Sequence, residues 1–285
     1  MYRGVTGQRL AAPVVDIPQG GSVASRSLGR LAVAAVAALS LAACSDTGTN
    51  PLVGSGQTMS LSFSGRRPAG VSGAMAVENV LGDTLVIGSG SDTLRLTSVE
   101  IVLRKIELER AGVTVNCDSV ADEHACEEFT IGPQLVSIPL GPGVATAIEV
   151  AVDSGSYKKV QFKIHKPGGD SLDVVFKAAH PDFASISIRV RGTFNGTPFT
   201  YTSSLDQEQE YSFVPPLVVD ASGSATNLTI RVDVSTWFRA GGTGALISPT
   251  TANVGGANEG TVKENIKNSF KAFRDHNRDG DERDG

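Results

Sequence analysis

Short runs of alternating apolar and polar residues dominate the chain from Met59 onward and predict β-strands. Leu61 and Phe63 alternate with serines, while residues 84–87 and 94–96 are short apolar runs bounded by Gly and Asp. Similar runs follow at 136–140, 147–152, 157–165, 217–219 and 227–234. About a dozen short strands at this spacing predict an all-β fold, an antiparallel β-sandwich of immunoglobulin-like or transthyretin-like type.

Three of these segments carry more detail than the bare pattern. Residues 186–194 and 197–203 are joined by Asn195-Gly196, which supplies the positive φ angles of a type I′ hairpin turn. In residues 99–109 the apolar positions fit neither the two-residue period of a strand nor the helical period of about 3.6 residues. Their Val and Ile content predicts a bulged strand rather than a helix. In residues 157–165 alternate positions face the core, which leaves a wet face made of Lys159, Gln161, Lys163 and His165.

The C-terminal part has a helical pattern instead. Thr261 and Glu264 have the spacing of a capping box, in which each side chain satisfies a backbone donor at a helix start. An apolar stripe then recurs at helical spacing in Val262, Ile266, Phe270 and Phe273. We expect an amphipathic helix over residues 261–274, after a loop at 241–260.

The N-terminal part is a long uncharged run. Residues 31–43 are apolar on every side, follow Arg26 and Arg30, and are too short to span a bilayer as a helix. A buried alanine-rich helix is the alternative, but it would need an amphipathic face. Because residues 1–22 have no helical or strand period, we expect translation to start downstream, for example at Val23.

The run ends in Leu41-Ala-Ala-Cys44, which resembles the lipobox of bacterial lipoprotein signal peptides. The resemblance implies a signal peptide over residues 1–43 and a lipidated, palmitate-bearing Cys44 as the first mature residue. Residues 44–57 are rich in small and polar residues and predict a flexible tether to a sandwich domain at 58–240. Ser45 after the cysteine is the arrangement associated with outer-membrane sorting in similar lipoproteins.

Charge and composition narrow the function. The whole chain has a net charge of −5, and removing the four Arg and one Asp before Cys44 brings it to −8. This acidity excludes nucleic acid as a partner and polybasic attachment to anionic lipid. Aromatic residues make up 6% of the chain, while its 32 Gly and 13 Pro favour short strands with tight turns.

The two remaining cysteines suit an exported chain. Cys117 and Cys126 lie close together, and pairing them in a disulfide is the simplest expectation in an oxidising compartment. The alternative is a metal site with His124, but the spacing is not that of a zinc knuckle and no fourth ligand is evident.

The last eleven residues, 275–285, form an acidic tail that resembles the first half of an EF-hand calcium loop. Oxygen-bearing side chains alternate and Gly280 holds the sixth position. The chain departs from the EF-hand pattern because Glu282 holds the apolar eighth position and the chain stops before the twelfth. Calcium is therefore the one candidate cofactor, bound weakly, and a frayed, solvated tail is the alternative. The candidate ligands are Asp275, Asn277, Asp279 and Asp281.

Catalytic patterns are poor. Residues 169–172 spell the four letters of the GDSL esterases, but Ser171 is expected between two strands and no Asp-x-x-His follows. No histidine has an obvious carboxylate partner at short range, and no catalytic residue is assigned. Trp237 either forms the base of a ligand site or, as is more common for such a residue, fills one end of a sandwich core.

Taken together, the chain resembles uncharacterised β-sandwich lipoproteins of bacterial envelopes. The resemblance rests on residues 98–107, on Gly155-Ser-Tyr157 and on residues 233–238. It implies a fold and an envelope location. From the sequence as a whole we expect a lipid-anchored protein of the outer membrane that binds or scaffolds an envelope protein or polysaccharide and is not an enzyme. Two alternatives are a hydrolase of envelope material and a weak calcium-binding module.

Overall fold

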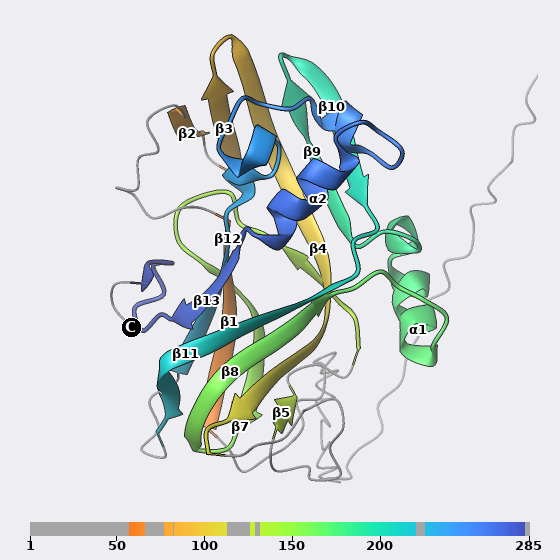
Figure 1. Cartoon of the computed structure of the whole chain (residues 1–285). Helices are drawn as coiled ribbons and strands as arrows, with labels where there is room; N and C mark the ends of the chain where they lie inside the picture. The colour runs from red at the N-terminus through yellow and green to blue at the C-terminus, as the bar shows by residue number, and fades with distance from the viewer. Residues whose placement is uncertain are drawn as a thin grey trace, which may run out of the picture. The chain divides into compact units, whose positions relative to one another are not determined.

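Two β-sheets and two short α-helices make up the part of the chain that the computed structural model describes, which is residues 57–65, 77–81, 83–112, 126–128, 132–220 and 226–282 (Figure 1). These residues all fall within one compact unit, Thr49–Gly285. The expected all-β sandwich with a helix near its C-terminus is confirmed.

The smaller sheet has four strands in the order β13-β12-β1-β7. Its pairs are antiparallel except β1 with β12, which run parallel with Leu61 opposite Leu228. A purely antiparallel sandwich is therefore wrong at this pair. The strands are β1 (Gln57–Ser64), β7 (Ala145–Val152), β12 (Thr226–Val232) and β13 (Phe270–Arg274).

The larger sheet is built around β4, a strand of 19 residues, Asp92–Arg110. The first part of β4 pairs with β3 and β9, and its later part pairs with β5, β6 and β8. One strand thus joins two regions of the sheet. The others are β2 (Val77–Leu81), β3 (Thr84–Ser89), β5 (Cys126–Glu128), β6 (Gln134–Ser137), β8 (Gly155–Ile164), β9 (Ile188–Phe194), β10 (Thr197–Ser203) and β11 (Gln207–Val219).

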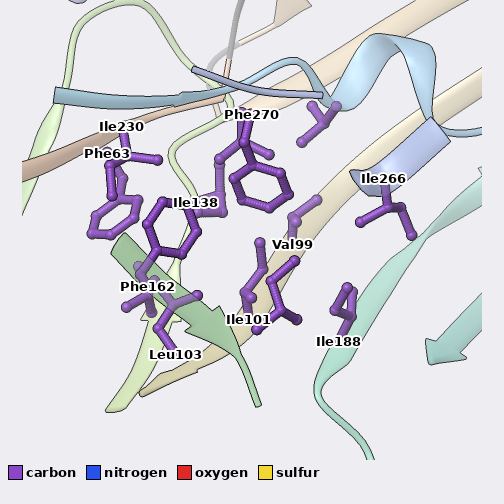
Figure 2. Packing of buried hydrophobic residues seen from close by; sticks show 14 of the residues in the cluster. Phe63, Val99, Ile101, Leu103, Ile138, Phe162, Ile188, Ile230, Ile266 and Phe270 are labelled. Atoms are coloured by element: carbon purple, nitrogen blue, oxygen red, sulfur yellow. The ribbon is translucent and has the colours of Figure 1, made fainter. Parts of the chain in front are cut away.

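The core lies between the two sheets, and Figure 2 shows side chains from both meeting there. Phe63 and Ile230 come from the small sheet, and Ile101 and Phe162 from the large one. All four are at most 1% exposed. Phe270 of β13 packs against Phe162 with the rings tilted and their centroids 5.7 Å apart. Removing an aromatic side chain from such a position costs about 3–5 kcal/mol, so this layer fixes how the sheets pack.

The predicted hairpin and the predicted bulged strand are both confirmed. Asn195 and Gly196 have φ angles of 51° and 81°, as a type I′ turn requires. Strand β4 shows register shifts at three points, one of them between Arg104 and Glu107. On β9, Gly192 packs against β4 so closely that an added Cβ would lie 1.9 Å from the carbonyl oxygen of Arg95.

The prediction for the C-terminal helix is right in kind and wrong in extent. Helix α2 spans Glu259–Lys267, with Asn258 at its N-cap, so Thr261 lies inside the helix and makes no capping box. Phe270 and Phe273 lie on β13, not on the helix. Residues Phe270–Arg274 pair with β12 and satisfy the backbone hydrogen-bonding groups at that edge of the small sheet. This pairing outweighs the preference for a helix that the weak apolar stripe indicates.

Two further elements were not expected. Strand β11 begins ten residues before the predicted 217–219 run, because its polar first half pairs with β8 as an edge strand. Helix α1, Ser171–Ala179, follows β8, with Asp170 as N-cap accepting a bond of 2.9 Å from the backbone N–H of Asp173. Short 3-10 turns are η2 (Pro181–Phe183), η3 (Val234–Thr236), η4 (Ala240–Gly242) and η5 (Pro249–Ala252).

No helix in the described residues is both long enough and apolar enough to cross a membrane.

Candidate functional site

The bulge in β4 places two consecutive side chains, those of Arg104 and Lys105, on the outer face of the large sheet. Arg104 pairs with Lys163 and Glu107 pairs with Gln161, so Lys105 and Ile106 together oppose one residue of β8. Ile106 is fully buried, which turns Arg104 and Lys105 outward. Lys105 has a φ of 52°, in the left-handed region, where a residue with a side chain costs of order 1–3 kcal/mol. Such strain is concentrated at sites with a function.

A pocket of about 210 Å³ opens beside this bulge. Its walls come from β4, β8 and β11 and carry both signs of charge. Gln161 Nε2 donates to Glu208 Oε1 over 2.9 Å, and Lys163 Nζ lies 3.1 Å from Asp206 Oδ2, so these polar walls are held in place. The pocket is smaller than most sites for metabolites, which favours a small polar group or a single side chain of a partner. The lining residues are Lys105, Glu107, Gln161, Phe162, Lys163 and Glu208.

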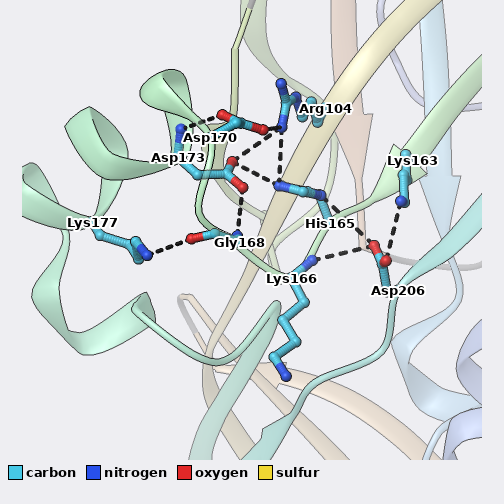
Figure 3. A network of polar contacts seen from close by, with 9 residues as sticks. All are labelled: Arg104, Lys163, His165, Lys166, Gly168, Asp170, Asp173, Lys177 and Asp206. Carbon is cyan, nitrogen blue, oxygen red and sulfur yellow. Dashed lines mark hydrogen bonds and ion pairs between the residues drawn. The ribbon is translucent and has the colours of Figure 1, made fainter.

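Beside the pocket, Arg104 begins a polar network that reaches helix α1 (Figure 3). Its Nη1 donates to Asp170 Oδ2 over 2.6 Å and to Asp173 Oδ1 over 3.2 Å. The backbone N–H of Asp173 and then the Arg104 guanidinium lower the pKa of Asp170. These bonds connect β4 to the N-terminus of α1, where negative charge is also favoured by the helix dipole.

His165 lies at the centre of the same network. Its Nε2 is 2.8 Å from Asp173 Oδ1, and its Nδ1 is 3.7 Å from Asp206 Oδ1. The expectation that no histidine has a nearby carboxylate is therefore wrong, as is the expectation that His165 lies on a wet face, since it is 7% exposed. Asp173 also accepts from the backbone N–H of Gly168, so the carboxylate is held from several sides.

This geometry is not that of a hydrolase triad. In a triad one histidine nitrogen contacts a carboxylate and the other contacts the nucleophile, whereas both nitrogens of His165 face carboxylates. Ser171 lies between strands β8 and β9, as expected, but it is the first residue of helix α1, which was not expected there. It is exposed in the first turn of α1.

Sequence reasoning missed this site because its members are distant in the chain. Arg104 and Asp173 are 69 residues apart and meet only through strand pairing. The sequence did contain one local indication of helix α1, because Asp170 and Asp173 have the spacing of an N-cap residue and the N3 residue of a helix.

The acidic tail packs on the outer face of the small sheet, and the expectation of a frayed tail is wrong for residues 275–282. Asp275 is fully buried. It accepts hydrogen bonds from Thr229 Oγ1 (2.8 Å) and from the backbone N–H groups of Asp279 (3.2 Å) and Gly280 (3.0 Å). Arg278 Nη2 donates to Ser60 Oγ over 3.0 Å.

The four candidate calcium ligands bond to the protein and to each other in this tail. Asn277 Nδ2 donates to Asp279 Oδ2 over 3.0 Å, and the backbone N–H of Asp281 donates to Asp279 Oδ1 over 2.7 Å. Among the described residues there is no group of three or more His, Cys, Asp or Glu side chains placed to hold a metal.

The other predicted site residues are placed as follows. Trp237 is fully buried and its Nε1 donates to Ser269 Oγ over 2.8 Å, so its side chain is part of the core. Cys44 and Cys117 lie outside the described residues, as do the signal peptide and almost all of the tether. Cys126 is described only as part of the backbone of β5, so the disulfide stays a prediction.

The chain matches no protein-family model, no curated protein sequence and no solved structure.

Proposed function

We propose that the chain is a lipid-anchored protein of the bacterial cell envelope, in the outer membrane, whose sandwich domain binds a partner and does not catalyse. The anchoring part rests on the lipobox that ends at Cys44, and outer-membrane sorting rests on Ser45. The partner is an envelope protein or a polysaccharide, and the membrane is contacted through the lipid.

The pocket beside the β4 bulge is the observation that supports a binding role. Its cationic and anionic walls are fixed by the Gln161–Glu208 bond and the Lys163–Asp206 pair. Pre-organised polar groups lose little entropy when a partner docks, which favours recognition. The size of the pocket suits one inserted side chain or a few sugar hydroxyls, because larger ligands need more volume.

The binding role is tested by placing a photo-crosslinking amino acid at Gln161, on the pocket wall, in cells that make the full chain. A matched control carries it at Val254, which is 70% exposed and lies just after η5. We expect a discrete adduct from Gln161 that is absent from Val254. The same adducts from both positions, or none from either, would contradict a partner site at the pocket.

The anchor is tested separately by membrane fractionation. We expect the wild-type chain in the membrane fraction and the Cys44→Ser variant unprocessed or soluble. A Cys44→Ser variant that is matured and stays membrane-bound would contradict lipidation at this residue.

The runner-up is a hydrolase of envelope material, which the strand-to-helix turn at Ser171 favours. Loss of a measured esterase activity in Ser171→Ala would establish it. The third candidate is a weak calcium module in the tail, favoured by the positive φ of 81° at Gly280, the sixth loop position.

A further inference from the structure

An apolar tip projects from β11 at the edge of the large sheet. Ser212 pairs with Lys159 and Leu217 pairs with Tyr157, and the residues between them bulge away from β8. Val214 is 94% exposed there, and Pro215 and Pro216 beside it are exposed as well. Val218 adds a side chain that is 49% exposed. This tip, residues 214–218, presents the apolar side chains of Val214, Pro215, Pro216 and Val218 to solvent.

The tip lies at the end of the sandwich where β1 begins. Val219 pairs with Gly155 at the start of β8, and Val152 at the end of β7 pairs with Gln57. A short turn of two residues, Asp153 and Ser154, joins β7 to β8. The first residue of β1 and the tip therefore flank the same turn, and β8 and β11 reach that end together in Figure 1.

From these positions we propose that the tip inserts into the head-group region of the bilayer to which the chain is anchored. The proposal rests on the proposed lipidation of Cys44, which precedes Gln57 by 13 residues. Even fully extended, that length of chain spans at most about 45 Å. The end of the sandwich that carries the tip is thus the end held nearest to the membrane, where exposed valine and proline side chains meet lipid.

A protein partner fits this tip less well. Stable protein interfaces use about 20–30 residues on each side, many more than this tip offers. A second copy cannot extend the sheet here, because Pro215 and Pro216 have no N–H to donate and the bulge interrupts the edge. Pro215 and Pro216 alone are enough to prevent another strand from pairing with this edge. Preventing such pairing therefore does not require the exposed side chain of Val214.

Electrostatic attraction to anionic lipid is not what would bring the tip to the membrane. Near the tip, Lys159 bonds Glu109 and Glu210, and Arg110 bonds Asp153. Because these opposite charges neutralise each other, attraction to charged head groups is weak, and contact between the apolar side chains of the tip and lipid would drive the binding. Binding should consequently depend little on the charge of the head group.

Insertion of the tip would fix the orientation of the candidate site. The bulge in β11 lies opposite Lys158, and Gln161 lies three residues further along β8, which is about 10 Å in an extended strand. The pocket would therefore lie beside the head-group layer, where it would meet a partner at the membrane surface.

The test uses the full lipidated chain in phosphatidylcholine vesicles whose acyl chains carry bromine, a contact quencher of tryptophan fluorescence. Val214→Trp is compared with Val254→Trp, and the native Trp237, which is fully buried, supplies a constant background. We expect quenching in Val214→Trp to exceed that in Val254→Trp by at least about twofold, with the same result when anionic lipid is added. Thermal melting of both variants verifies that they are folded.

The outcomes separate this proposal from the anchor itself. Chains that float with the vesicles but show equal quenching in the two variants would overturn insertion of the tip and leave the anchor intact. Chains that do not float would overturn both. Concentration-dependent self-association that Val214→Asp abolishes would assign the tip to a second copy and overturn the proposal.

Discussion

The buried carboxylate of Asp275 gives the sharpest prediction for stability. It is fully buried and accepts three hydrogen bonds, from Thr229 Oγ1 and from the backbone N–H groups of Asp279 and Gly280. Asp275→Ala leaves the buried Thr229 hydroxyl and the buried Gly280 N–H without this acceptor, whereas the exposed Asp279 N–H keeps Asn277 Oδ1 as a second acceptor at 3.1 Å. A hydrogen bond to a charged group contributes about 1.5–3 kcal/mol, and such values do not add fully within one network. We therefore expect a loss of about 3–5 kcal/mol in the free energy of unfolding.

Urea unfolding of the chain from Ser45 onward measures this loss. With a slope of about 2–3 kcal/mol per molar urea, the midpoint should fall by roughly 1–2 M. Asp275→Asn should lose less, because the amide oxygen still accepts while the charge is gone.

Asp279→Ala is the matched control in the same tail. Its side chain bonds only neighbouring tail residues at the surface, so we expect a loss below about 1 kcal/mol. If Asp275→Ala were no more destabilised than Asp279→Ala, the buried network could not be what holds the tail on the small sheet.

Three further predictions concern charge, packing and calcium. Burial raises the pKa of Glu109, but hydrogen bonds from Lys158 and Lys159 outweigh it and hold the pKa below its ordinary 4.5. The stability that Glu109 contributes is present above that pH and is lost as the pH falls through the lowered pKa. Acid titration of unfolding should thus show a shallower fall for Glu109→Gln than for wild type, and parallel curves would contradict it. Gly192→Ala should unfold the hairpin region, because a Cβ would lie 1.9 Å from a carbonyl oxygen of β4; an unchanged melting temperature would refute that packing. Calcium should leave the melting temperature unchanged, because Asp275 is already held by protein donors, and a rise that Asp279→Ala abolishes would establish the calcium module instead.

The alternation of apolar and polar residues was sufficient to predict the strands that face the core. Leu61 and Phe63 on β1 are fully buried, as expected, because one face of each sheet must pack on the other. The bulge in β4 was also predictable, since two consecutive positions there break both periods. Edge elements were not: the first half of β11 carries too little apolar signal, and β13 is a strand only because β12 provides a neighbour.

The candidate site was hidden for a related reason. His165 looked exposed because its position in the alternating run pointed away from the core. Helix α1 then covers that face and brings Asp173 against it. Local pattern gives the face of a strand, but it does not show which later element will pack on that face.

Mass spectrometry of the N-terminal peptide of the membrane-purified protein tests whether the chain is lipid-anchored. We expect a peptide that begins at Cys44 and carries the mass of attached fatty acid. A peptide that begins upstream of Cys44, or an unmodified cysteine at that position, would contradict a lipid-anchored envelope protein.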